Sequence, residues 1–370
     1  MNETLPKDRQ MMAAALHVAW CHTGRCWPNP CVGAVLVDKG GTCIAVDVTA
    51  LGGRPHAEAR LLRHAGKRAE GGTLYVTLEP CCHEGETPPC TDMIIRACVR
   101  RVVVAMEDCD ERMRGASIAL LRDAGIHVTC GVMEEEAQRL YRGYVMRNRH
   151  GRPYVTAKLA LSRDGMTARK RGERTLISNR EALRYGHMLR LTCDAVLVGA
   201  NTWRVDRPRL DCRLEGVSHG ERCHLARVIL DRRLTLSQDS ALVRHAHETP
   251  LWIMAEERAI KEKGHAWKDK GCVLMALPYD VAPPHHVAVQ DILSTLAERG
   301  VTHLLLEGGG MLFSSFVRCG YVDDIILFRG DHMLGEEGYA GWGGEAMLRE
   351  YVLSRSVTLG AHSMECYHRV

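Results

Sequence analysis

The chain of 370 residues has no long apolar run, and its first residues do not resemble a secretory signal. The longest apolar candidate, Met11–Trp20, has ten residues and includes His17, whereas a helix that crosses a bilayer needs about 18 or more. The start, MNETLPKDRQ, lacks the basic region and the apolar region of a signal peptide. We therefore expect no membrane association and a location in the cytoplasm.

The sequence also lacks a strong excess of charge of one sign. Its formal net charge is +4, and residues 1–148 are neutral overall. Proteins that bind polyanions usually carry a strong basic excess, and grooves for single-stranded RNA add aromatic side chains. The chain contains only 3 Phe, so its composition does not indicate binding to nucleic acid. A zinc-stabilised RNA-binding protein without catalysis remains one alternative.

Cysteine, in contrast, is abundant, with 16 residues. Disulfides are rare in the reducing cytoplasm, so most of these side chains are expected to be buried small hydrophobic groups or free thiols. Cysteines that occur near histidine at metal-ligand spacing require a separate interpretation.

Helical and strand patterns alternate along the chain and predict two layered α/β domains with largely parallel strands. In the first half, strands are predicted at 31–38, 73–78, 101–106 and 126–130, and helices at 8–23, 57–65, 116–124 and 134–148 and from 90 onward. The polar segment 147–153 contains Gly and Pro and is the predicted boundary. We divide the chain into residues 1–148 and residues 149–370.

The strongest chemical signal lies in residues 56–90. His56-Ala57-Glu58 begins a predicted helix, Pro80-Cys81 follows a strand, and Cys90 opens another helix. One imidazole and two thiolates would hold Zn²⁺ and leave a fourth position for water. Zinc lowers the pKa of bound water, so hydroxide is available near neutral pH. Glu58 would carry the proton of this water to the substrate nitrogen.

The spacing of the two cysteines leaves alternatives open. The deaminase signature pairs H-x-E with P-C-x-x-C, whereas Cys81 and Cys90 form C-x₈-C. A closed structural zinc site and a site without metal remain possible, and Cys82 and His83 are rival ligands. Cys81 is favoured because its Pro-Cys junction matches the signature.

Four segments around this site resemble the family of bifunctional riboflavin-biosynthesis deaminase/reductases: Trp27–Pro30, Arg54–Glu58, Thr77–Cys81 and Thr87–Cys90. The resemblance implies a cytidine-deaminase-like three-layer α/β/α domain that holds zinc at His56, Cys81 and Cys90. It also implies that Glu58 is the proton shuttle and that Asn29 contacts the pyrimidine.

Two positions of this half depart from the family pattern. Asp47-Val48-Thr49 stands where many members carry Gly-x-His, and Glu86 stands where many carry Lys or Arg. A basic residue there would attract a substrate phosphate, whereas a carboxylate would repel it.

Signals in the second half are weaker. Glu307–Gly310 follows an apolar strand and precedes a helix, so its backbone N–H groups could approach a phosphate. A simple helix-entry loop has the same pattern, and the segment is not a G-x-G-x-x-G fingerprint. The basic run Arg169–Arg174 is either a solvated loop or a source of attraction for phosphate.

The same family resemblance continues through this half, on Lys158, Ser162–Gly165, Asp194–Gly199, Thr202, Asp206–Pro208 and Glu307–Gly309. It implies a dihydrofolate-reductase-like α/β domain that uses NADPH. The implied cofactor contacts are Ala160, Thr202, Asp206, Gly308, Gly309 and Gly310. The implied substrate contacts are Lys158, Arg190, Arg213 and Glu307. Arg174, Leu176 and Asp331 depart from the family pattern, Leu176 standing where a Trp is usual.

We therefore expect a two-domain enzyme of riboflavin biosynthesis. Its first domain would hydrolytically deaminate a phosphoribosylated diaminopyrimidinone, and its second would reduce the ribose to a ribityl chain with NADPH. The alternative is a deaminase with a degenerate or structural second domain. A small phosphorylated pyrimidine is the expected substrate, and a homo-oligomer is the expected assembly.

Overall fold

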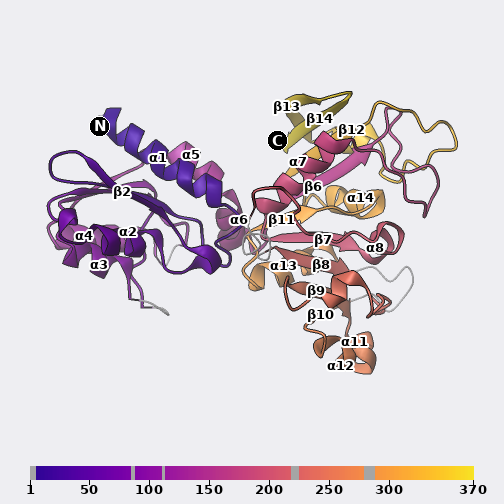
Figure 1. The fold of residues 1–370 in the computed structure, drawn as a ribbon, viewed down its shortest axis with the longest axis horizontal. Helices are drawn as coiled ribbons and strands as arrows, with labels where there is room; N and C mark the ends of the chain where they lie inside the picture. The colour runs from indigo at the N-terminus through magenta and orange to yellow at the C-terminus, as the bar shows by residue number, and fades with distance from the viewer. Residues whose placement is uncertain (1–5, 85–87, 111–112, 218–224, 279–287) are drawn as a thin grey trace. The chain divides into compact units, whose positions relative to one another are not determined.

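A computed structural model describes the chain except for residues 1–5, 85–87, 111–112, 218–224 and 279–287. The chain divides into two compact units, Met1–Gly151 and Arg152–Val370 (Figure 1). Each unit is built on a sheet of its own.

The first unit contains a five-stranded sheet in the order β2-β1-β3-β4-β5. Its strands are β1 (Gly33–Val37), β2 (Cys43–Val48), β3 (Thr73–Leu78), β4 (Arg101–Met106) and β5 (His127–Cys130). The predicted parallel pairing holds for β3, β4 and β5, whereas β1 runs antiparallel to both of its neighbours. Strand β2 was not predicted, because it is a half-exposed edge strand without a regular apolar alternation.

Helices cover both faces of this sheet and give the predicted three-layer α/β/α arrangement (Figure 1). The long helices are α1 (Pro6–His22), α2 (Ala57–Ala65), α3 (Cys90–Arg96), α4 (Ala116–Asp123), α5 (Glu134–Leu140) and α6 (Arg142–His150). Alternate residues of one strand serve the two layers: Val35 packs in the core with α1 and α5, and Leu36 packs in the core with α2 and α3. Short 3-10 helices lie at Leu51–Gly53 and Gly66–Ala69.

The single helix predicted at 134–148 is two helices, separated at Tyr141. This residue is buried, and its hydroxyl donates to the carbonyl of Cys31 at 3.2 Å and contacts Thr77 Oγ1. The break therefore allows a polar side chain at the end of α5 to reach buried partners of the sheet.

The second unit contains a nine-stranded sheet in the order β10-β9-β8-β7-β11-β6-β12-β14-β13. Its strands are β6 (Tyr154–Leu161), β7 (Ala195–Gly199), β8 (Ala226–Leu230), β9 (Leu251–Glu256), β10 (Val273–Leu277), β11 (His303–Leu306), β12 (Asp324–Arg329), β13 (Tyr351–Leu359) and β14 (His362–Arg369). The seven strands from β10 to β12 in this order are parallel, and the final hairpin β13–β14 joins antiparallel.

Helices of this unit follow the strands along the chain. They are α7 (Arg180–Leu191), α8 (Ala200–Asp206), α10 (Ala241–Arg244), α11 (Glu257–Lys263), α12 (His265–Lys268), α13 (Val289–Glu298) and α14 (Gly310–Arg318), with a 3-10 helix at Glu345–Leu348. In β6, Ala160 pairs with Phe328, which packs against Ala182 of α7. Because side chains alternate along a strand, Lys158 lies on the same face of the sheet as Ala160.

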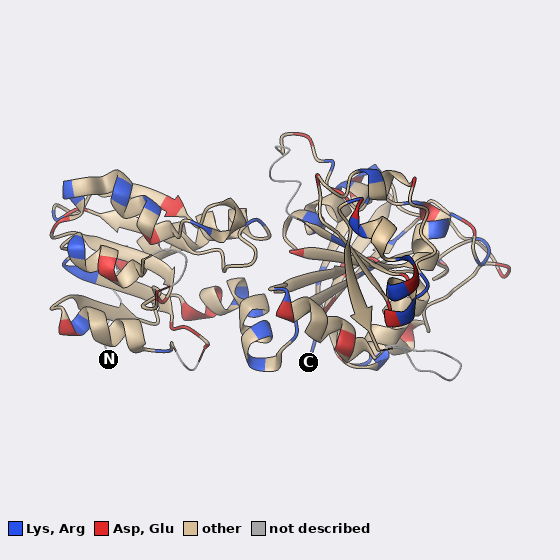
Figure 2. Ribbon diagram, turned by 90° about the horizontal axis from the view of Figure 1, so that it is seen from below, with Lys and Arg blue, Asp and Glu red and all other residues tan. Residues whose placement is uncertain are grey.

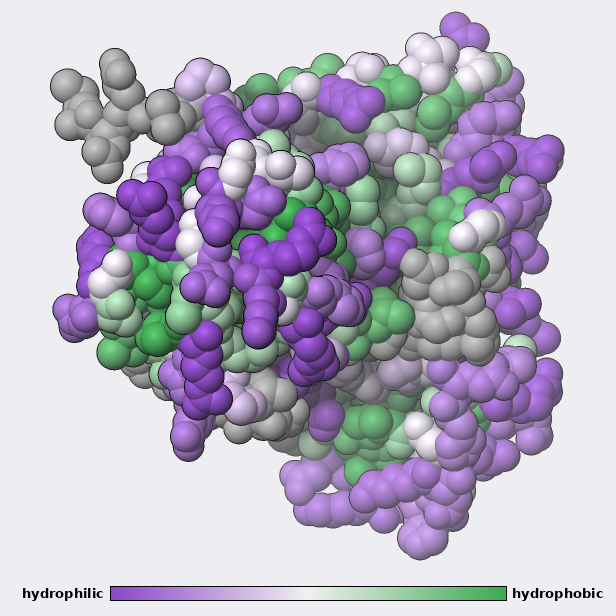
Figure 3. Space-filling view, turned by 60° about the vertical axis from the view of Figure 1, so that its left-hand side comes forward, coloured by the Kyte–Doolittle hydropathy of each residue, from purple (hydrophilic) through white to green (hydrophobic). Residues whose placement is uncertain are grey.

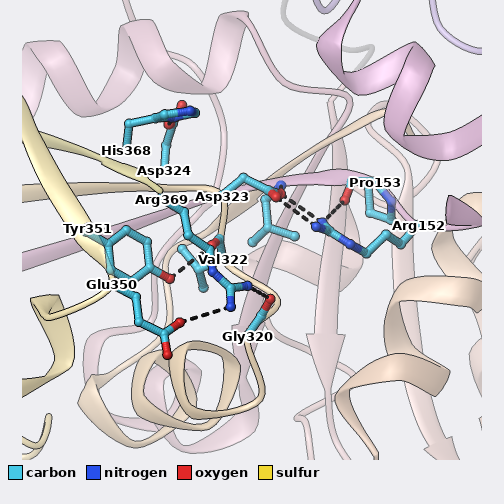
Figure 4. A network of polar contacts seen from close by, with 11 residues as sticks. Arg152, Pro153, Gly320, Val322, Asp323, Asp324, Glu350, Tyr351, His368 and Arg369 are labelled. Atoms are coloured by element: carbon cyan, nitrogen blue, oxygen red, sulfur yellow. Dashed lines mark hydrogen bonds and ion pairs between the residues drawn. The ribbon is translucent and has the colours of Figure 1, made fainter. Parts of the chain in front are cut away.

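Each chain end of the second unit is held by an ion pair with a residue next to β12 or β13 (Figure 4). Arg152 donates through both terminal nitrogens to Asp323, at 2.8 and 2.7 Å. Arg369 pairs with Glu350 at 2.9 Å and also donates to the carbonyl of Gly320. The Arg152–Asp323 pair thus fixes the first residue of the unit to the segment that enters β12.

Basic and acidic residues are interspersed along the ribbon of both units (Figure 2). The face drawn in Figure 3 is mostly hydrophilic, with hydrophobic residues in patches between polar ones. In the described part of the chain, no helix has the length and apolar character needed to span a membrane.

Candidate functional site

Three soft ligand atoms converge where β3, α2 and α3 meet. His56 caps the N-terminus of α2, Cys81 lies just beyond β3, and Cys90 is the first residue of α3. The Nδ1 atom of His56 lies 3.4 Å from Cys90 Sγ and 3.5 Å from Cys81 Sγ, and all three ligand atoms lie within 4.8 Å of one another. Tetrahedral zinc with ordinary bond lengths separates such N and S atoms by about 3.6 Å, so the set fits this ion.

The two thiols differ in how readily they ionise. Hydrogen bonding with Cys90, with further help from His56, lowers the pKa of the Cys81 thiol to about 4, although its burial opposes this shift. The same Cys90–Cys81 hydrogen bond and burial raise the pKa of Cys90. Each thiol thus affects the ionisation of the other, and a divalent cation bound between them would favour the thiolate form of both.

Glu58 lies in the first turn of α2 and is only 3% exposed. Its Oε2 atom is buried and has no hydrogen-bond partner among the residues that the structure describes. Burial raises the pKa of its carboxyl group. A buried carboxylate oxygen left open beside the ligand group needs a polar partner. A water molecule and a substrate amine are partners of the required kind.

The rival ligands are not part of this group. Among the described residues, the atoms that converge belong to His56, Cys81 and Cys90 alone. Cys82 is partly buried, and burial, together with Glu79, raises the pKa of its thiol. His83 is exposed.

Asn29 and Thr49 each form a side-chain hydrogen bond with the backbone of the first unit. The Asn29 amide donates to the carbonyl of Gly53 at 2.9 Å, at the turn that precedes His56. Thr49 is buried, and its hydroxyl accepts from the backbone N–H of Val32 at 3.0 Å. Thr49, one of the residues that depart from the family pattern, therefore ties the residue before β1 to the end of β2. Glu86, which also departs from that pattern, lies outside the described residues.

Glu79 holds the segment that carries Cys81 in place, although in the sequence it stands out only as part of the motif Thr77–Cys81. Its carboxylate is buried and accepts from the backbone of Asp108 and Gly115, each at 3.0 Å, and from the Ser117 hydroxyl at 2.8 Å. It fixes the segment that carries Cys81 to the start of α4. A buried acidic residue directly after an apolar strand is the signal that could have identified it.

The residues expected to form the reductase site line one cavity of about 600 Å³ at the carboxyl ends of β6, β7 and β11. They are Lys158, Ala160, Arg190, Thr202, Asp206, Arg213, Glu307, Gly308, Gly309 and Gly310. The edge formed by the carboxyl ends of parallel strands is the usual place for a ligand in an open α/β sheet.

A forked ion pair lies in this cavity. Arg190 donates to Glu307 through Nε at 2.6 Å and through Nη2 at 2.7 Å. Burial would raise the pKa of the Glu307 carboxyl, but the charge of Arg190 and its hydrogen bonds lower it overall. Burial lowers the pKa of Lys158, and Glu307 opposes that shift. In this cavity the Glu307 carboxylate is therefore paired with Arg190 and is also stabilised by the charge of Lys158.

The glycine turn is packed closely at the start of α14. The N–H group of Gly309 donates to Thr202 Oγ1 at 3.0 Å. A Cβ atom at Gly310 would lie 2.3 Å from the carbonyl oxygen of Gly341, so only glycine fits there. Asp206 lies farther along α8, and burial raises the pKa of its carboxyl group.

Three departures from the family pattern are placed differently. Arg174 and Leu176 line the cavity, and Leu176 is 68% exposed. Asp331 is exposed, pairs with His332 at 3.3 Å and does not line the cavity. Tyr339 lines it as well. Tyr339 has no recognisable signal in the sequence because it lies in an irregular segment, where its backbone is held by Ala168.

Comparison with known proteins matches both units. Residues 153–362 match the family described as RibD C-terminal domain, and residues 5–106 match the cytidine and deoxycytidylate deaminase zinc-binding region. The riboflavin biosynthesis protein RibD of Aquifex aeolicus is 38% identical over 329 residues, which cover 89% of this chain and 88% of that protein. The Escherichia coli RibD is 32% identical over 341 residues, covering 90% and 89%.

Solved structures agree over nearly the whole length. Acinetobacter baumannii RibD, form 1, superposes with a TM-score of 0.88 at 30% identity, covering 99% of this chain and 100% of that one. A Thermotoga maritima protein described as a diaminohydroxyphosphoribosylaminopyrimidine deaminase and 5-amino-6-(5-phosphoribosylamino)uracil reductase superposes with a TM-score of 0.81 at 30% identity, covering 98% and 99%.

Proposed function

Because the chain belongs to the RibD family of riboflavin biosynthesis proteins, we propose a role for each residue of its two sites. The chain is a bifunctional enzyme, a zinc-dependent deaminase and an NADPH-dependent reductase. It acts on a small pyrimidine. This family membership favours the bifunctional enzyme over the deaminase with a merely structural second domain.

The proposed deaminase substrate is the phosphoribosylated diaminopyrimidinone, the compound that the name of the Thermotoga protein describes. We propose that His56, Cys81 and Cys90 hold Zn²⁺. Bound there, the ion supplies Lewis acidity that makes a water molecule nucleophilic near neutral pH. Water adds to the ring carbon that carries the amine, the C–N bond breaks, and ammonia leaves. Asn29 is the proposed contact to the pyrimidine ring.

Glu58 is proposed to move the proton in this reaction. The observation that supports the proposal most strongly is its buried Oε2, which has no hydrogen-bond partner in the described part of the chain. The carboxyl group also interacts electrostatically with the proposed ligands His56 and Cys81. This oxygen would accept a proton from the attacking water and then donate it to the leaving nitrogen. Burial raises the pKa of the carboxyl group, so the protonated form that the second step needs is accessible.

In the second unit, we propose that the substrate ribose contacts Lys158, Arg190, Arg213 and Glu307. NADPH supplies the hydride when bound, and the protein positions the reactants. The fork between Arg190 and Glu307 holds both side chains in one orientation. The proposed cofactor contacts are Ala160, Thr202, Asp206 and the turn Gly308–Gly310, all of which line the same cavity.

One incubation tests both activities. The full chain is mixed with the phosphoribosyl diaminopyrimidinone with and without NADPH, and the products are identified by mass. Without NADPH, the product should have lost one amine and gained one oxygen. With NADPH, it should also gain two hydrogens. Loss of the amine without any reduction, even with NADPH present, would favour the deaminase-only alternative.

Three finer expectations belong to the same proposal. The division at 148/149, a homo-oligomeric assembly and a cytoplasmic location are each proposed from the sequence. Sedimentation of the purified chain tests the assembly, and fractionation of cells tests the location.

A further inference from the structure

A second cavity, of about 650 Å³, adjoins the reductase cavity on the side of β8. The two cavities share residues at the glycine turn and around it: Gly172, Asn201, Thr202, Gly309, Gly310 and Tyr339. A long ligand could therefore extend from one cavity to the other past the first residue of α14. None of the residues proposed above to bind the ribose lines the second cavity.

Four arginines line this second cavity: Arg171, Arg204, Arg232 and Arg233. Among its described lining residues, the one carboxylate is Asp231. That carboxylate is already used, since its oxygens accept from the backbone N–H groups of Thr235 at 2.6 Å and Leu236 at 2.7 Å. The cavity is therefore strongly cationic, which favours a ligand with more than one negative charge.

Arg204 is the arginine best held for recognition. Its Nη2 atom donates to Thr235 Oγ1 at 2.9 Å, and the same hydroxyl donates to Asp231 Oδ1 at 2.9 Å. One end of the guanidinium group is thus fixed, and other donors remain for a ligand. Arg232 lies 3.8 Å from Glu256, which partly offsets its charge. Arg233 is exposed.

We propose that this cavity receives the 2′-phosphate of NADPH and that Arg204, supported by Arg233, selects NADPH over NADH. The inference rests on the proposed placement of the cofactor at the turn Gly308–Gly310. If the diphosphate lies at the start of α14 and the nicotinamide lies beside Lys158 and Glu307, the adenosine end extends into the second cavity. A phosphate monoester adds about −1.5 to −2 charge, and arginine binds such a group through paired hydrogen bonds.

Equilibrium binding tests this selection without measuring catalysis. The zinc-loaded full chain is titrated with NADPH and with NADH, with no pyrimidine present, and binding is followed by cofactor fluorescence. Arg204→Ala should weaken the binding of NADPH about 10- to 100-fold, as expected for the loss of charged hydrogen bonds. It should leave the affinity for NADH unchanged. Arg233→Ala should act in the same direction. Arg258→Ala is the matched control, because Arg258 is exposed, pairs with Glu262 and lines neither cavity.

Competition with small phosphates identifies which phosphate the cavity binds. The 2′,5′-ADP should displace NADPH better than 5′-AMP does from the wild-type chain, and this advantage should shrink in Arg204→Ala. The inference would be overturned if Arg204→Ala and Arg233→Ala weakened the binding of NADPH and NADH equally, or changed the binding of neither cofactor. The inference would also be overturned if these variants weakened only the binding of ribose 5-phosphate. The cavity would then hold the phosphate of the substrate. A wild-type chain that binds neither cofactor would instead refute the proposed reductase.

Discussion

Glu58 combines a buried carboxylate with one oxygen, Oε2, that has no hydrogen-bond partner among the described residues. In a structural role, such an oxygen would be paired, because an unsatisfied buried acceptor costs about 1–3 kcal/mol. Its position two residues beyond His56, in the first turn of the same helix, keeps it close to the ligand group without making it a ligand.

We predict that Glu58→Gln retains zinc and loses deamination by about 10²–10⁴-fold, the usual contribution of general acid–base catalysis. The amide has nearly the same shape but cannot carry the proton. Metal analysis and initial rates are measured on the same preparation. Glu70→Gln, an exposed change of the same kind, is the control. Wild-type turnover in a zinc-loaded Glu58→Gln chain would contradict the proposed shuttle.

Cys82 and Cys90 provide a second test of the metal site. Cys90→Ala should remove zinc, because Cys90 Sγ lies 3.4 Å from the Nδ1 atom of His56. Cys82→Ala should retain about one zinc per chain, because Cys82 lies outside the group. Metal content after dialysis distinguishes the two. The opposite pattern would mean that the ligand thiol was misassigned.

Among the elements, α1 is fixed to the sheet of the first unit by a buried ion pair as well as by apolar packing. Asp8 accepts from Arg101 of β4 at 2.9 and 2.8 Å and from the hydroxyl of Tyr75 of β3 at 2.9 Å. Burial alone would raise the pKa of Asp8, but these hydrogen bonds and the charge of Arg101 lower it overall. The first helix is thereby tied to two strands of the parallel part of the sheet.

We predict that Asp8→Asn destabilises the chain by about 3 kcal/mol at pH 7, because it leaves the Arg101 charge without its partner. Since the folded-state pKa of Asp8 is below its usual 3.8, its stabilisation is present above pH 3.8 and is lost as the pH falls through the lower, folded value. The difference between wild type and variant should therefore shrink in acid. Urea unfolding at pH 7 and at lower pH values measures it, with the exposed Asp123→Asn as control. An equal difference at every pH would contradict this linkage.

For the whole molecule, the chain divides into two units with separate sheets, and the two proposed sites share no residue. We predict that a fragment of residues 1–148 binds zinc and deaminates without NADPH. A fragment of residues 149–370 should bind NADPH and reduce only the deaminated compound. Calorimetry with NADPH and mass analysis of products are the measurements.

The ion pair of Arg152 with Asp323 gives this prediction a control (Figure 4). A fragment of residues 154–370 lacks Arg152 and leaves the Asp323 carboxylate without the guanidinium, so it should unfold at a lower urea concentration than 149–370. The bifunctional assignment would be contradicted if the 149–370 fragment were folded and bound no NADPH, and the intact chain bound none either.

Much of the fold was predictable because its elements have local causes. Strands 73–78 and 101–106 were predicted with the bounds that the structure has, since their apolar runs end at turns or charged residues. The edge strand β2, the final hairpin β13–β14 and the break at Tyr141 were not. Their positions depend on pairing and buried hydrogen bonds with distant residues, which leave little periodicity in the segment itself.

The zinc-ligand hypothesis came from the sequence alone, because His56, Glu58, Cys81 and Cys90 stand at the ends of predictable elements and lie in segments that resemble a known family. The tertiary structure decided which atoms meet, and it left Cys82 and His83 outside the group. It also placed Lys158, Arg190 and Glu307, which are far apart in the chain, in one cavity. Of the cationic cavity around Arg204, only Arg171 had a sequence signal, as part of the basic run Arg169–Arg174. Arginines from three separate segments become one site only when the sheet brings their strands and helices together.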